Sequence, residues 1–157
     1  MQKITPFLWF DTQAEEAASF YVSLFPNSAI TNISHNTSGA PSPQGVFMVN
    51  FVLDGQEFIA LNGGPAFKFN EAVSFFVDCA TQAEVDRLWD KLTEGGAEVQ
   101  CGWLKDKYGL SWQIVPSGLN ELLNGKDAEG ARRAMQAMLK MKKLDLEQMR
   151  QAYEGVG

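Results

Sequence analysis

The chain has 157 residues, and 45% of them are hydrophobic, including 11 phenylalanines, so it can bury a sizeable core. Its net charge of −6 argues against nucleic acid as a partner. No apolar run approaches the roughly 20 residues of a membrane span, and no secretion signal is evident, so we expect a cytoplasmic protein that does not enter membranes.

The first half of the chain predicts a strand, a helix and three further strands. The expected elements are a strand over residues 4–10, a helix to about residue 25, and strands over residues 28–34, 46–53 and 57–61. Thr12 and Glu15 fit a capping box that would begin the helix. The polar stretch over residues 34–45 is rich in Pro, Gly and Ser and predicts a loop.

The second half repeats this pattern. Thr-Gln-Ala-Glu occurs at residues 12–15 and again at residues 81–84. Strands are expected over residues 73–77, 98–101, 103–105 and 110–115, with a helix over residues 81–93 and a turn at residues 106–109. Beyond the repeat, helices are expected over residues 119–123, from about residue 128, and from about residue 144.

This internal repeat predicts an α+β fold of two β-α-β-β-β modules, over residues 3–62 and 71–116, within a single domain over residues 1–157. Each module would form a curved, mostly antiparallel sheet, and the two sheets would form a cleft. Residues 117–157 would add a helical extension, whose Met-rich stripe could cover the protein's own sheet or that of a second subunit.

Strand alternation assigns each side chain of the first strand in a module to one of two faces. Leu8 and Phe10, and in the second module Phe75 and Val77, should meet the helix. The concave face should receive Thr5, Phe7 and Trp9 from one module and Ala72, Ser74 and Phe76 from the other.

Several short motifs resemble a known family. They are Leu8-Trp9-Phe10-Asp11, Glu16-Ala17 with Phe20-Tyr21, Leu53-Asp54-Gly55, Leu61-Asn62-Gly63-Gly64-Pro65, Gln82-Ala83-Glu84-Val85-Asp86, Cys101-Gly102-Trp103-Leu104-Lys105-Asp106 and Ser111-Trp112-Gln113. Together they resemble the PhnB-like branch, labelled 3-demethylubiquinone-9 3-methyltransferase domain, of the vicinal oxygen chelate superfamily. That superfamily includes glyoxalase I, extradiol dioxygenases and proteins of bleomycin and fosfomycin resistance. The resemblance spans roughly residues 3–118 and implies a homodimer.

The resemblance also implies four metal-ligand positions, which fall here at Thr5, Ile59, Ala72 and Gln113. Only Gln113 could ligate a metal, and weakly. The single histidine, His35, lies at the edge of the predicted loop and is expected to be solvated. We therefore expect no metal and no cofactor.

Other chemistry has little support in the sequence. Gly63-Gly64-Pro65 is not followed by a helical pattern, so a turn is favoured over a cradle for S-adenosylmethionine. Cys79 is expected to be a small core residue. Cys101 is the only candidate thiol nucleophile, and no histidine is near it in the sequence.

What remains is a concave surface with aromatic walls and a few polar groups, which suits a flat or apolar small molecule. The candidate ligand-binding residues are Thr5, Phe7, Trp9, Asn50, Asn62, Ser74, Phe76, Trp103 and Gln113. The aromatic residues could instead fill a core. Three functions compete: a binding protein without turnover, a metal-independent enzyme, and a methyltransferase.

Overall fold

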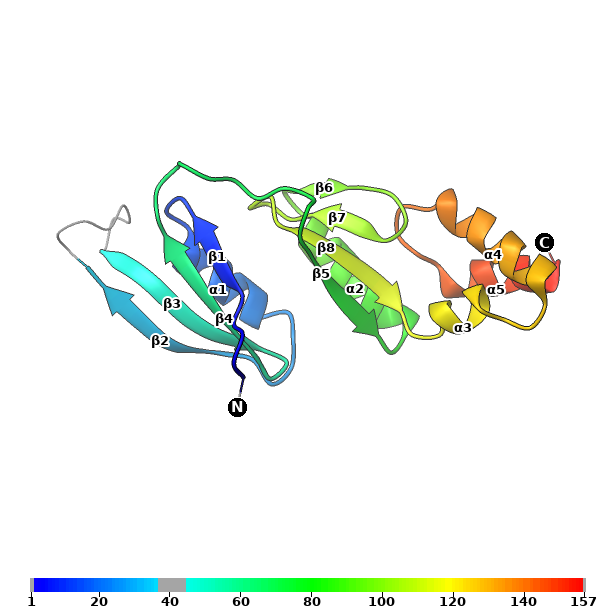
Figure 1. Cartoon of the computed structure of the whole chain (residues 1–157), viewed down its shortest axis with the longest axis horizontal. Coiled ribbons are helices and arrows are strands. Elements are labelled where there is room, and N and C mark those ends of the chain that lie inside the picture. Colours follow the sequence, from blue (N-terminus) through cyan, green and yellow to red (C-terminus); the bar gives the residue numbers. More distant parts are fainter. Residues whose placement is uncertain (1, 37–44, 157) are drawn as a thin grey trace. The chain divides into compact units, whose positions relative to one another are not determined.

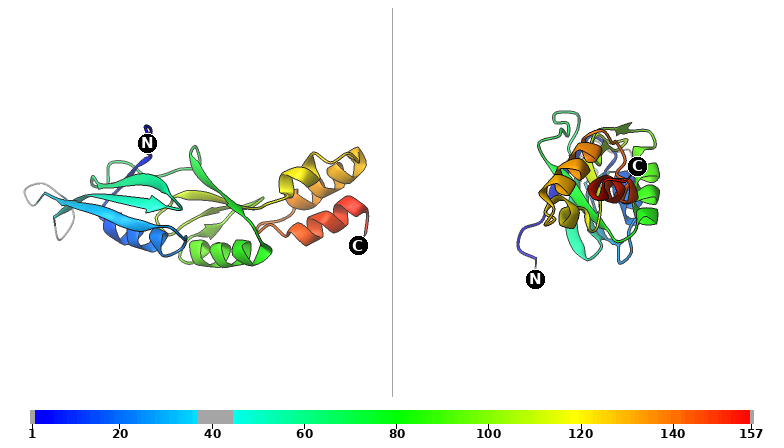
Figure 2. Two further views of the ribbon diagram at one scale, coloured as in Figure 1. Left: turned by 90° about the horizontal axis from the view of Figure 1, so that it is seen from below. Right: turned by 90° about the vertical axis from the view of Figure 1, so that its right-hand side faces the viewer.

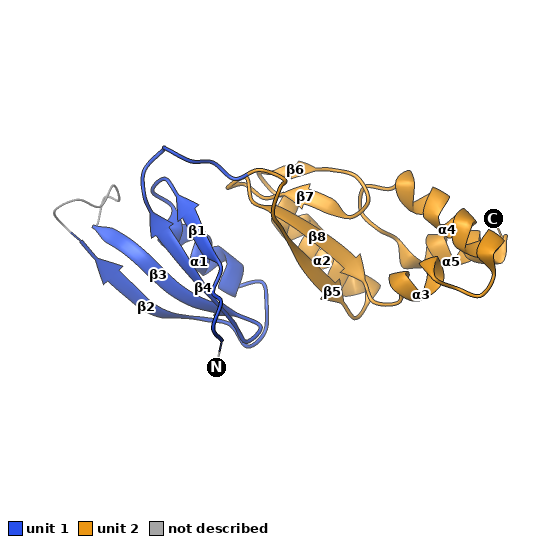
Figure 3. Cartoon of the chain, viewed as in Figure 1, with its two compact units in different colours: residues 1–69 blue, residues 70–157 orange. Residues whose placement is uncertain are grey.

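The computed structural model of the chain describes residues 2–36 and 45–156. Its contacts form two compact units, Met1–Phe69 and Asn70–Gly157 (Figure 3). The predicted loop over residues 34–45 falls mostly outside the described residues. No helix in the described part of the chain is long and apolar enough to cross a membrane.

The first unit is a four-stranded sheet with one helix on one face (Figures 1 and 2). Its elements are β1 (Phe7–Phe10), α1 (Ala14–Val22), β2 (Ala29–His35), β3 (Val46–Leu53) and β4 (Gln56–Asn62). The strand order is β1-β4-β3-β2, and β1 is parallel to β4 while the other pairs are antiparallel. Leu8 and Phe10 are buried, as expected for the face that α1 covers.

The second unit repeats this arrangement and adds three helices (Figure 1). Its elements are β5 (Ser74–Cys79), α2 (Gln82–Thr93), β6 (Ala97–Glu98), β7 (Trp103–Lys105), β8 (Ser111–Pro116), α3 (Leu119–Leu123), α4 (Ala128–Leu139) and α5 (Leu146–Glu154). The strand order is β5-β8-β7-β6, again with one parallel pair, β5 and β8. The predicted α+β fold of two β-α-β-β-β modules with C-terminal helices is confirmed.

The two helices of the repeat begin in different ways. In α2 the hydroxyl of Thr81 accepts a hydrogen bond from the backbone N–H of Glu84 at 3.1 Å, which satisfies one free donor of the first turn. In α1 the predicted capping box of Thr12 and Glu15 is wrong, because the N-cap is Gln13 and makes no capping bond. The backbone N–H of Ala14 instead donates to a side chain from the end of β4.

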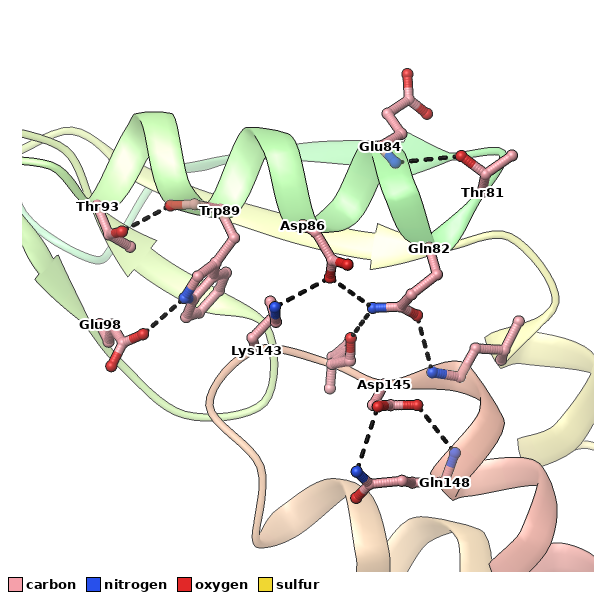
Figure 4. A network of polar contacts seen from close by, with 12 residues as sticks. Thr81, Gln82, Glu84, Asp86, Trp89, Thr93, Glu98, Lys143, Asp145 and Gln148 are labelled. Atoms are coloured by element: carbon pink, nitrogen blue, oxygen red, sulfur yellow. Dashed lines mark hydrogen bonds and ion pairs between the residues drawn. The ribbon is translucent and has the colours of Figure 1, made fainter.

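The segment that leads into α5 docks on the second unit's own α2 (Figure 4). The amide of Gln82 donates to the carbonyl of Leu144 at 2.9 Å and accepts from the N–H of Leu146 at 3.1 Å. Lys143 pairs with Asp86 at 3.0 Å, and the pKa of Asp86 is lowered by the hydrogen bonds from Gln82 and Lys143. The segment that leads into α5 is therefore anchored on its own unit.

An apolar cluster stabilises that docking. Its buried members are Val115, Leu119, Leu144 and Met149, and Met138 and Met141 pack against them with Leu122, Leu123 and Leu146. Met138 and Met141 of the Met-rich stripe thus fill irregular space between α4, α5 and the end of β8, a role that suits the flexible thioether side chain, whereas Met135 is 38% exposed.

Candidate functional site

We call the face of each sheet that points away from α1 or α2 the distal face. In the second unit, strand pairing puts Phe76, Gln113 and Trp103 in one row across this face. The amide of Gln113 donates to the hydroxyl of Ser74 at 2.9 Å. Phe76 is 60% exposed although it lies in a strand, and so it presents a ring to solvent beside two polar groups.

The distal face of the first unit carries a comparable row. Phe7 pairs with Ile59, which pairs with Asn50, so the three side chains share the face. Phe7 is 52% exposed. The structure therefore brings four of the predicted residues together in the second unit and places Phe7, Trp9 and Asn50 on the corresponding face of the first.

Trp9 is held in place by the segment that follows β4. Its indole N–H donates to the carbonyl of Gly64 at 2.9 Å, and its ring meets the ring of Phe67 edge to face at 4.9 Å. A Cβ atom at Gly63 would collide with the indole, so glycine is needed there. Residues 63–73 contain no helix. Gly63-Gly64 is therefore a turn that closes the module, as predicted from the sequence.

Asn62 does not lie on the distal face, and this prediction is wrong. Its side chain is 1% exposed on the side of α1. The amide oxygen accepts from the N–H of Ala14 at 2.8 Å and the amide nitrogen donates to the carbonyl of Val46 at 3.1 Å. Asn62 is therefore a buried cap of α1 and is unsuited to ligand binding.

Thr5 and Ala72 lie outside the strands in which they were expected. The first strand begins only at Phe7 and the fifth only at Ser74. Pro6 has no N–H to donate to a ladder, which is consistent with a later strand start, although its carbonyl accepts from Ile59 at 3.0 Å. Strand alternation therefore does not assign these two side chains to a face.

Three polar residues that were not predicted from the sequence lie next to the row of Phe76, Gln113 and Trp103. Ser111 lies between Ser74 and Lys105 in the neighbouring row of the same face. Lys105 forms an ion pair with Glu71, and the hydrogen bond from Lys105 lowers the pKa of that carboxyl. Ser111 precedes Gln113 by two residues, so strand alternation could have found it.

Neither cysteine is placed as a nucleophile. Cys79 is fully buried, and burial raises the pKa of its thiol to about 12, with smaller contributions from Glu84 and Asp78. Cys101 lies in a turn at φ +58°, and its N–H donates to the carbonyl of Met141 at 2.8 Å. Cys79 is thus a core residue, and the Cys101 thiol donates to the carbonyl of Met138 at 3.6 Å.

A groove of about 420 Å³ lies among the C-terminal helices, away from the predicted site residues. Its lining residues are Gly118, Glu121, Leu122, Leu146, Arg150 and Tyr153. Arg150 pairs with Glu147, and the Tyr153 hydroxyl accepts from the N–H of Asp127 at 3.2 Å. Two of its polar groups thus already have partners within the extension.

Comparison with known proteins identifies the family. A family model described as 3-demethylubiquinone-9 3-methyltransferase matches residues 2–115. The chain belongs to this family. A PhnB protein of Bacillus cereus, described by the same activity, is 40% identical over 74% of this chain and 100% of its own, with a TM-score of 0.69. No curated protein matches the chain.

More distant structures show how widely the fold of this PhnB-like chain is shared. A protein of Pseudomonas aeruginosa is 21% identical over 74% of this chain and 98% of its own, with a TM-score of 0.61. The fosfomycin resistance protein FosX of Listeria monocytogenes, solved with Mn(II) and sulfate, is 14% identical over 78% of this chain and 94% of its own, with a TM-score of 0.54. The fold is that of the vicinal oxygen chelate superfamily.

The residues of this PhnB-like chain do not fit the metal that the superfamily implies. Of the four expected ligand positions, the side chains of Ile59 and Ala72 carry no ligand atom, and Thr5 and Gln113 offer only a hydroxyl and an amide oxygen, which are weak ligands for a transition metal. Residues 2–36 and 45–156 contain no group of three or more His, Cys, Asp or Glu side chains that could hold a metal ion. His35 is exposed at the end of β2.

Proposed function

We propose that this PhnB-like protein binds a flat or apolar small molecule on its distal faces, without a protein-held metal. The observation that carries the proposal is the exposure of Phe76, a large aromatic side chain in a strand, beside the polar pair of Gln113 and Ser74. An exposed aromatic ring next to a few oriented polar groups is typical of a ligand surface.

The competing interpretation is that these rings complete a core. Phe10 shows what a core ring on a first strand looks like in this protein, because it is only 3% exposed. Phe7 and Phe76 are 52% and 60% exposed, which favours a binding surface over a filled core.

Adjacent phenylalanines of β5 provide the test. We expect Phe76→Ala to lower the free energy of unfolding by less than about 1 kcal/mol, because the ring is mostly exposed. It should weaken binding of a flat probe such as 2-naphthalenemethanol about fivefold or more, since aromatic contacts dominate such surfaces. Urea unfolding and calorimetric titration measure the two effects.

Phe75→Ala is the matched control on the opposite face. The ring of Phe75 meets that of Trp112 edge to face at 5.4 Å, so its loss should cost roughly 2–4 kcal/mol of stability. If Phe76→Ala instead destabilised the protein as much as Phe75→Ala and left probe binding unchanged, the proposal would be refuted.

The second candidate function is an enzyme of the PhnB-like branch, and the family's name favours a methyltransferase. The Gly63-Gly64 turn does not lead into a helix, so S-adenosylmethionine would have to bind in a different way from its common mode. Saturable calorimetric binding of S-adenosylmethionine, with no binding of aromatic probes, would favour the methyltransferase over the binding protein.

Two further features belong to the proposal. We expect a homodimer, as the resemblance to the vicinal oxygen chelate superfamily implies. We also expect the protein to work in the cytoplasm, where Cys79 and Cys101 would remain thiols.

A further inference from the structure

Ser111 is a buried hydroxyl that the fold leaves without a partner. The residue is 1% exposed, and within the part of the chain that the structure describes its Oγ atom has no hydrogen-bond partner. Buried polar groups almost always have partners, so an exception points to an unmet role such as ligand binding. A hydroxyl can donate to an acceptor that arrives with a ligand.

The neighbour of Ser111 on β7 is a cation. Lys105 pairs with Ser111 across the two strands and forms an ion pair with Glu71, which lies in the turn before β5. The side chains of Lys105 and Glu71 are 38% and 57% exposed. Ion pairs exposed to this extent contribute little to stability, so Glu71 can leave Lys105 at small cost.

We propose that the ligand of this site carries an anionic oxygen group, a carboxylate or a phosphate ester, which binds Lys105 and Ser111 after displacing Glu71. This inference rests on the proposed binding function and names the chemistry of the ligand. Glu71 acts as an internal competitor, because its carboxylate occupies Lys105 in the free protein while leaving the Ser111 hydroxyl unsatisfied.

The geometry of the sheet suits a ligand with an aromatic body and an acidic group. Two rows of side chains lie two residues apart along the strands of this face. One row is Ser74, Ser111 and Lys105, and the other is Phe76, Gln113 and Trp103. Same-face side chains along a strand are about 6–7 Å apart, so a fused aromatic ring system that stacks on one row can carry an acidic group that reaches the other row. One molecule can therefore contact both rows.

Three probes with one ring system test this inference by calorimetric titration: 2-naphthoate, 2-naphthyl phosphate and the neutral 2-naphthalenemethanol. We expect at least one anionic probe to bind about fivefold or more tightly than the alcohol, as expected for a charge-assisted contact. The comparison between the two anionic probes shows whether the group is a carboxylate or a phosphate ester.

Three variants locate the effect. Glu71→Gln removes the competitor's charge and should tighten binding of the preferred anionic probe about three- to fivefold. Lys105→Met should abolish the preference for that probe over the alcohol, and Ser111→Ala should reduce it. Glu94→Gln and Lys91→Met make the same charge changes at exposed positions of α2 and its C-cap, and should have no effect.

The outcomes separate this inference from the function on which it rests. If all three probes bind equally and Glu71→Gln changes nothing, the anionic group is refuted while the aromatic surface stands. If none of the probes binds the wild type or Glu71→Gln at millimolar concentration, both the anionic group and the aromatic surface are refuted. Weaker binding of the anionic probes to Glu71→Gln would also overturn the role of Glu71 as a competitor.

Discussion

Replacing Asp106 with alanine is expected to destabilise the second unit by about 4 kcal/mol, the largest effect that we predict for a single polar residue. Asp106 is 3% exposed, and its carboxylate organises the turn between β7 and β8. One oxygen accepts from the N–H groups of Tyr108 and Leu110 at 2.8 and 3.1 Å. The other accepts from the indole of Trp112 at 2.9 Å.

The size of this effect follows from what the substitution leaves behind. Each buried donor that loses its acceptor costs roughly 1–3 kcal/mol, and three donors depend on this carboxylate. Asp90→Ala is the matched control, because Asp90 is exposed on α2 and should change stability by less than about 0.5 kcal/mol. Urea unfolding measures both, and equal midpoints for the two variants would contradict this account of the turn.

Replacing Asn62 with alanine is expected to cost about 3 kcal/mol, because the buried amide satisfies groups on two elements. Without it, the N–H of Ala14 at the start of α1 and the carbonyl of Val46 at the start of β3 both lose a partner. Asn62→Asp keeps an acceptor for Ala14 but places a buried carboxylate against the carbonyl of Val46, so a loss of stability at least as large is expected.

Asn50→Ala is the control for Asn62, since it makes the same change on the distal face of the same sheet. Its side chain is only half-buried, and its expected effect on stability is within about 0.5 kcal/mol. A loss at Asn50 as large as that at Asn62 would show that the two faces are not distinct in the way the structure indicates.

The faces of the strands could be predicted from the sequence, whereas their register could not. Leu8-Trp9-Phe10-Asp11 corresponds to Phe75-Phe76-Val77-Asp78, which aligns Phe7 with Ser74. Asp54-Gly55 corresponds to Tyr108-Gly109, which aligns Ile59 with Gln113. In the structure Phe7 pairs with Ile59, but Ser74 pairs with Ser111, two residues earlier. A shift of two residues keeps each side chain on its face, so alternation survives an error in register.

The start of α1 shows a second limit. Local sequence favours Thr12 and Glu15 as a capping box, and the same four residues do begin a helix in the second module. In the first module a side chain 48 positions away caps the helix instead. A contact so distant in sequence leaves no signal in a local motif.

The candidate site was predicted in part, for the same physical reasons. Phe76 and Gln113 could be placed by alternation, because each lies within a regular strand. Alternation also places Ser111 on the distal face, but its importance comes from burial without a partner, which only the fold reveals. The ion pair of Lys105 with Glu71 joins a strand to a turn, which only the fold brings together.

The four tryptophans offer the most direct test of a ligand surface on the distal faces, because each indole N–H gives one resolved NMR signal. Trp9 and Trp103 belong to these faces. The N–H groups of Trp89 and Trp112 are bonded to Glu98 and Asp106 on the opposite side of the second sheet.

Titration of the ¹⁵N-labelled protein with 2-naphthoate, with signals assigned through Trp→Phe variants, is therefore decisive. We expect a saturable shift of the Trp103 signal, with the signals of Trp89 and Trp112 unchanged. A saturable shift confined to Trp89 or Trp112, or none at Trp103 when the probe is in large excess, would contradict it.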